Sequence, residues 1–103
     1  VIRPYQSSDI YSALHLYPIQ IDVNNTTVSR SKVFDMLRKS GIGVNVHYIP
    51  VHTQPYYLEM GFTCGDFPVS ESYYYNAISL PLFPQMSFDD QDKVVTTLMS
   101  AFQ

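Results

Sequence analysis

Residues 41–57 read GIGVNVHYIPVHTQPYY and hold more polar and aromatic chemistry than any other stretch of the chain. Apolar residues alternate along the first half of this stretch: Ile42, Val44 and Val46. A period of two is typical of a strand with one buried face, which turns His47 toward the other face. Pro50 has no backbone N–H to donate to a neighbouring strand. We therefore expect a strand over 42–49 that ends in a polar loop.

Strand and helix patterns precede this stretch. Residues 11–22 predict a strand, in which Pro18 causes a bulge or marks a sheet edge. A helix should follow, with Thr27 or Ser29 as its N-terminal cap and Gly41 in the left-handed position after its last turn. The chain up to the central stretch is thus predicted to be a strand and then a helix.

The second half of the chain continues the alternation. Pro55 begins a short helix, residues 69–77 predict another, and residues 78–80 predict a short strand. Ser87 and Asp90 predict a capping box at the start of the last helix. That helix carries one apolar stripe: Val94, Val95, Leu98, Met99 and Phe102. The pattern predicts an α/β (α+β) domain with a small, mostly antiparallel sheet of about three strands packed against helices.

Length and composition narrow the function classes. At 103 residues the chain has the length of one domain, and because it begins at Val1 without a methionine we expect a fragment of a larger protein. The net charge of −3 and the six scattered basic residues argue against a nucleic-acid partner. The single cysteine, Cys64, precludes an intrachain disulfide and favours a cytoplasmic protein. No apolar run is long enough to span a membrane.

Histidines and tyrosines are the candidate site residues. His15, His47 and His52 could together bind zinc, but their spacing matches no common ligand pattern, and His15 could equally be hydrogen-bonded at a sheet edge. The nine tyrosines favour an interface or a ligand contact, because tyrosine combines a large apolar ring with a polar tip. Cys64 has no basic neighbour in sequence to activate it, so we expect a bystander thiol.

Five motifs resemble, in the same order, the C-terminal segment of sugar-nucleotide aminotransferases of the DegT/DnrJ/StrS family. They cover nearly the whole chain: SALHLYPI at 12–19, GIGVNVHYIPVH at 41–52, QPYY at 54–57, GDFP at 65–68 and AISLPLFP at 77–84. Within the family, the chain is most similar to the transaminases of the pseudaminic-acid pathway, which aminate C4 of a UDP-linked 4-keto-6-deoxy sugar.

The resemblance implies the small C-terminal domain of a fold type I enzyme that uses pyridoxal phosphate (PLP), with residues 1–103 forming that domain. Such an enzyme transfers an amino group from L-glutamate to the sugar nucleotide and is usually a homodimer. In the family, the PLP-binding lysine and most other cofactor contacts belong to a large domain that is absent here. We therefore expect this chain alone neither to bind the cofactor nor to catalyse transamination.

The resemblance also assigns substrate contacts to the small domain. The matching positions are His47, Tyr48, His52 and Tyr56, and His15 joins them if its strand lies beside the central one. Imidazole and phenol groups can both donate to and accept from sugar hydroxyls and diphosphate, so the chemistry agrees with this assignment. The alternative is a free-standing binding or interaction module that has no catalytic activity.

Overall fold

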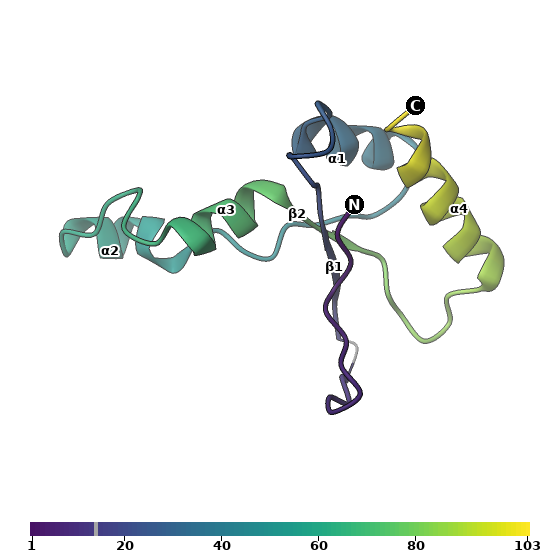
Figure 1. Ribbon diagram of the computed structural model, residues 1–103, viewed down its shortest axis with the longest axis horizontal. Coiled ribbons are helices and arrows are strands. Elements are labelled where there is room, and N and C mark those ends of the chain that lie inside the picture. The colour runs from purple at the N-terminus through teal and green to yellow at the C-terminus, as the bar shows by residue number, and fades with distance from the viewer. Residues whose placement is uncertain (14) are drawn as a thin grey trace.

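The computed structural model describes residues 1–13 and 15–103 of the chain. Within these residues the fold comprises two strands, four α-helices and one short 3₁₀ helix (Figure 1). In chain order they are β1 (Tyr17–Gln20), α1 (Arg30–Lys39), η1 (Val51–Thr53), α2 (Pro55–Glu59), α3 (Pro68–Asn76), β2 (Ala77–Leu80) and α4 (Phe88–Ser100). In the described part of the chain, no helix combines the length and the hydrophobicity needed to cross a bilayer.

Strands β1 and β2 pair in antiparallel fashion, from Tyr17 opposite Leu80 to Gln20 opposite Ala77. The register is continuous through Pro18, so the predicted bulge is not formed; the alternative, a sheet edge, is confirmed, because β1 is one of only two strands in the described sheet. The strand predicted over 11–22 is also shorter than expected, and Leu14 within it lies outside the described residues. The mixed fold class with a small antiparallel sheet is confirmed.

The strand predicted over 42–49 is reduced to a single bridge. Asn45 and Ser79 exchange both backbone hydrogen bonds, at 3.2 and 2.8 Å, and no ladder continues beyond them. Ile42 and Val44 are nevertheless buried, as the alternation predicted. The described sheet therefore has two strands in place of about three, because alternation reports which side chains are buried and not whether the backbone finds a partner.

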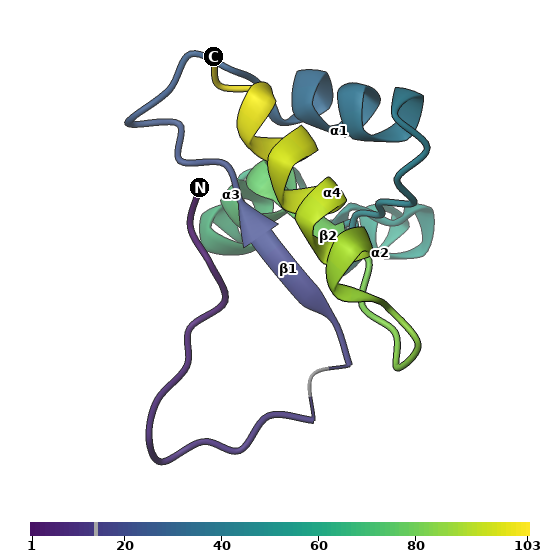
Figure 2. The same cartoon turned by 90° about the vertical axis from the view of Figure 1, so that its right-hand side faces the viewer.

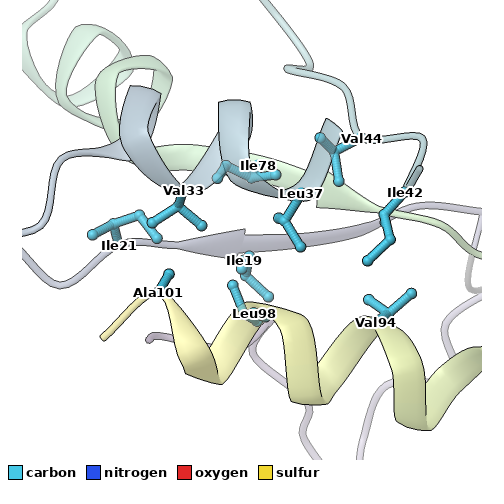
Figure 3. Close-up of a cluster of buried hydrophobic side chains, with 10 residues drawn as sticks. All are labelled: Ile19, Ile21, Val33, Leu37, Ile42, Val44, Ile78, Val94, Leu98 and Ala101. Carbon is cyan, nitrogen blue, oxygen red and sulfur yellow. The ribbon is translucent and has the colours of Figure 1, made fainter. Parts of the chain in front are cut away.

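The hydrophobic core lies between α1, α4 and the two strands (Figure 3). Its ten buried residues are Ile19, Ile21, Val33, Leu37, Ile42, Val44, Ile78, Val94, Leu98 and Ala101. Figure 2 shows α4 running across the sheet alongside β1, with α1 beyond its C-terminal half. Only part of the predicted stripe on α4 is buried, since Val95 and Met99 are 54% and 52% exposed.

The predicted helix ends are confirmed for α1 and α4. Ser29 caps α1 by accepting a hydrogen bond from the Lys32 backbone N–H, and Gly41 adopts a φ of 77° after the last turn. Ser87 and Asp90 form the expected capping box at the start of α4.

Residues 47–76, here called the arm, project from one side of the core and contain η1, α2 and α3 (Figure 1). The helices predicted after Pro55 and over 69–77 are both present there, as α2 and α3. The arm gives the molecule its long dimension of 48 Å. It also carries most of the predicted site residues.

Candidate functional site

The site loop, residues 47–52, leads from the core into the arm and includes the first two residues of η1. His47 lies half-buried, and its Nδ1 shares a 2.8 Å hydrogen bond with the Ser79 hydroxyl of β2. Tyr48 follows across a cis peptide bond, and its ring makes a T-shaped contact with the His47 ring at 4.5 Å between centroids. Because Tyr48 is 71% exposed, its hydroxyl is presented to the surroundings.

The other end of the site loop is buried. His52 is 7% exposed, and its Nε2–H donates a hydrogen bond of 2.7 Å to Oε1 of Glu71 on α3. The Gly65 backbone N–H donates to the same oxygen at 2.7 Å. The ring of Phe67 lies 4.8 Å from the His52 ring and covers it. The imidazole is therefore fixed by a carboxylate and an aromatic ring.

Glu71 is the charged centre of this contact. The Gly65 N–H, and after it the His52 side chain, lower the pKa of the Glu71 carboxyl below its ordinary value of 4.5. The sequence analysis did not select Glu71, because it lies 19 residues from His52 and belongs to a different helix. Its position in the first turn of α3 was the only available signal, and that position also suits a helix-dipole role.

Of the five predicted site residues, His47 and Tyr48 contact each other, and the described contacts of His52 are with Glu71 and Phe67. Tyr56 lies on α2, 67% exposed, with its ring against Tyr57. His15 is exposed in the segment before β1, and no described contact joins it to the site loop. The predicted proximity of His15 to this loop thus remains a prediction.

The described residues were also compared with what a metal ion or a covalently bound PLP requires. Among residues 1–13 and 15–103, no three His, Cys, Asp or Glu side chains lie close enough to hold a metal ion. The lysines at 32, 39 and 93 are exposed on α1 and α4, whereas a lysine that forms a Schiff base needs a desolvated pocket. The residues of this chain therefore do not fit a covalent PLP site.

Beside the site loop the arm forms an apolar hollow of about 310 Å³, lined mainly by Val51, His52, Tyr57, Phe62 and Phe67. Binding sites for small molecules commonly combine an apolar surface with a few polar groups of fixed orientation. His47 and Tyr48 do not line this hollow. The exposed Tyr48 and the held His47 ring form a separate polar surface of the site loop, which can bind a polar ligand through hydrogen bonds.

Comparison with known proteins identifies the class. The sequence model of the DegT/DnrJ/EryC1/StrS aminotransferase family matches residues 2–99, and the chain belongs to this family. The spore coat polysaccharide biosynthesis protein SpsC of Bacillus subtilis is 42% identical over 97 residues, which are 92% of this chain and 25% of SpsC. The chain spans about a quarter of the length of the curated relatives it matches.

Solved structures agree with the family and the fold. DesV of S. venezuelae, solved with a ketimine intermediate, aligns with a TM-score of 0.85 and 25% identity over 99% of this chain and 26% of DesV. PseC of Helicobacter pylori, an aminotransferase of pseudoaminic acid biosynthesis, aligns at 0.75 with 26% identity over 85% of this chain and 23% of PseC. A Streptococcus pneumoniae protein solved in PLP and PMP forms aligns at 0.74 with 28% identity, over 84% of this chain and 22% of that one.

Proposed function

We propose that this chain is the C-terminal domain, residues 1–103, of a PLP-dependent sugar-nucleotide aminotransferase. Membership of the aminotransferase family and the alignment with about a quarter of each solved relative support this assignment. The whole enzyme transfers an amino group from L-glutamate to a UDP-linked 4-keto-6-deoxy sugar. It acts in the cytoplasm as a homodimer, and the isolated chain is inactive.

The contribution of this chain is contact with the sugar nucleotide. The observation that carries the proposal is the site loop, which presents the exposed Tyr48 hydroxyl beside a His47 ring whose Nδ1 is already bonded. The Nε2 of His47 and the Tyr48 hydroxyl then contact sugar or diphosphate oxygens. Tyr56 and His15 supply further contacts from exposed positions, and His52 supports the loop from within.

PLP supplies the imine chemistry that moves the amino group, and it is held by the rest of the enzyme. The structures of the Streptococcus pneumoniae relative in PLP and PMP forms support PLP as the cofactor. The lysines of this chain are exposed, so the lysine that binds PLP belongs to another part of the enzyme. The chain's own task is to bind and orient the sugar.

The pseudaminic-acid pathway is our proposal for the sugar. Similarity to PseC supports it, at 26% identity, together with the motif resemblance over 41–57. The sugar-binding residues are expected to bind any sugar nucleotide, because they contact the hydroxyl and diphosphate groups that all sugar nucleotides share. The choice of sugar is therefore tested by the product formed and not by binding alone.

The experiment uses the full-length protein with L-glutamate and the UDP-linked 4-keto-6-deoxy sugar, and mass spectrometry detects the amino sugar. Tyr48→Phe should raise KM for the sugar nucleotide about threefold to tenfold, since it removes one hydrogen bond. Tyr75→Phe, another exposed tyrosine of the arm, serves as the matched control and should leave KM unchanged. Binding of the sugar nucleotide without any amino sugar would favour the binding-module alternative.

A further inference from the structure

Two polar side chains buried in the described residues both hold the site loop. Ser79, 4% exposed, bonds to His47 at one end of the loop. His52, 7% exposed, is itself the other end of the loop and bonds to Glu71. Burying a polar group costs free energy unless it is hydrogen-bonded, so these two contacts are strongly favoured in the folded state.

The two partners of the loop belong to one continuous backbone unit. Helix α3 ends at Asn76 and strand β2 begins at Ala77, so no linker separates Glu71 from Ser79. Strand β2 is in turn buried in the core through Ile78. The α3–β2 unit thus holds both ends of the site loop at a spacing that a flexible connection could not maintain.

Tyr48 depends on this support for its direction. It lies between the two held ends, and its described ring contact is with His47. An exposed side chain with one ring contact takes its orientation largely from the backbone that carries it. Binding groups need supporting residues that fix their geometry within a fraction of an ångström.

We propose that Glu71 and Ser79 are positioning residues: through His52 and His47 they fix the two ends of the site loop and so set the direction in which Tyr48 is presented. The identity of the ligand as a sugar nucleotide rests on the proposed function. The fixing of the loop itself rests on the hydrogen bonds of 2.7 and 2.8 Å.

The first measurement is hydrogen exchange of the full-length protein, followed by mass spectrometry of peptides from 45–56. Ser79→Ala and Glu71→Ala should each speed exchange there about fivefold to tenfold, as the loss of one buried hydrogen bond predicts. Peptides of α4 should keep the wild-type rate, which shows that the core is still folded. Glu71→Gln keeps a neutral acceptor and should restore most of the protection.

Matched controls are Ser72→Ala and Glu59→Ala, which change exposed residues of the arm. Both should leave exchange over 45–56 at the wild-type rate. Unchanged exchange in Ser79→Ala and Glu71→Ala would overturn the inference. An equal effect in the controls would overturn it as well, because loosening would then not depend on the two contacts.

The second measurement is titration of the same variants with UDP-N-acetylglucosamine. Ser79→Ala and Glu71→Ala should weaken binding about tenfold, although neither side chain is placed against the ligand. Faster hydrogen exchange over 45–56 with an unchanged affinity for UDP-N-acetylglucosamine would overturn the positioning role. If the wild-type protein does not bind this probe, the result counts against the proposed function, and exchange over 45–56 alone decides whether Glu71 and Ser79 fix the loop.

Discussion

The carboxylate of Glu71 accepts two hydrogen bonds at one oxygen, from the Gly65 backbone N–H and from His52. Hydrogen bonds to the charged form favour ionisation, which explains the lowered pKa of this carboxyl. At the residue scale, Glu71 therefore couples the turn at Gly65, helix α3 and the site loop. Protonation of a single side chain weakens all three connections at once.

This coupling predicts an acid dependence of stability. Because the folded-state pKa of Glu71 lies below 4.5, its contribution is complete above that pH and is lost as the pH falls through the lowered value. Glu71→Gln removes the titrating group, so its melting temperature should fall less steeply than that of the wild type as pH drops below 4.5. Thermal unfolding of the full-length protein between neutral and acid pH measures this difference.

The control for the acid dependence is Glu59→Gln, because Glu59 is exposed on α2. This variant should follow the wild-type curve. The pKa of Asp90 is also lowered, by the side chain and then the backbone N–H of Ser87, and that contribution persists in every variant compared. Identical slopes for the wild type and Glu71→Gln would contradict the prediction.

Residue-level reasoning from the sequence reached the site loop but not its supports. The family resemblance selected His47, Tyr48 and His52, and their contact with the substrate stays a prediction. The contacts of His52 with Glu71 and of His47 with Ser79 span 19 and 32 residues. Such contacts depend on how the arm folds back toward β2. The pattern of apolar residues within one segment does not predict them, because it reports only which side chains of that segment are buried.

At the scale of elements, α4 has the most completely satisfied N-terminus. The Ser87 hydroxyl accepts from the Asp90 N–H at 3.1 Å, and the Asp90 carboxylate accepts from the Ser87 N–H at 3.1 Å. Both bonds satisfy backbone donors that have no partner within the helix. The cap thereby fixes where α4 begins. The buried face of the same helix contributes Val94 and Leu98 to the core.

Removing this cap should destabilise the protein measurably. Ser87→Ala is expected to lower the free energy of unfolding by about 1 kcal/mol, the usual cost of losing a serine N-cap. Urea denaturation followed by circular dichroism measures the change. Ser72→Ala, at an exposed position inside α3, is the control and should cause no loss, since alanine is the better helix former. Equal destabilisation by both substitutions would argue against the capping role.

Helices were predicted more accurately than strands, for a physical reason. A helix satisfies its own backbone, so local signals such as Ser29, Gly41 and the Ser87 capping box suffice to locate its ends. A strand needs a partner from elsewhere in the chain. Residues 42–49 have the alternation of a strand, but only Asn45 meets the backbone of Ser79.

At the scale of the whole molecule, the chain is less compact than its length allows. Its radius of gyration is 15.5 Å, whereas about 13 Å is expected for a globular domain of this size. Its accessible surface is 7566 Å², against about 5900 Å² for a typical folded monomer of the same mass. The excess is about twice the surface that one partner buries in a standard protein interface.

The isolated chain should therefore be prone to association. Its exposed apolar side chains on the arm include Tyr48, Val51, Tyr56, Phe67 and Val69. We expect the 103-residue chain to sediment as oligomers or to bind a hydrophobic dye, because such surfaces are unfavourable in water. The full-length protein is the comparison and should bind less dye per molecule. A compact monomer of the isolated chain that does not bind the dye would contradict this expectation.

None of the ten core residues lies between Asn45 and Ala77, and the bridge between Asn45 and Ser79 brings the two ends of that interval together. The arm therefore adds no side chain to the hydrophobic core and keeps its shape through contacts of its own, such as that of His52 with Glu71. Substitutions at its exposed positions, such as Tyr56 and Val69, can change the surface of the arm without repacking the interior.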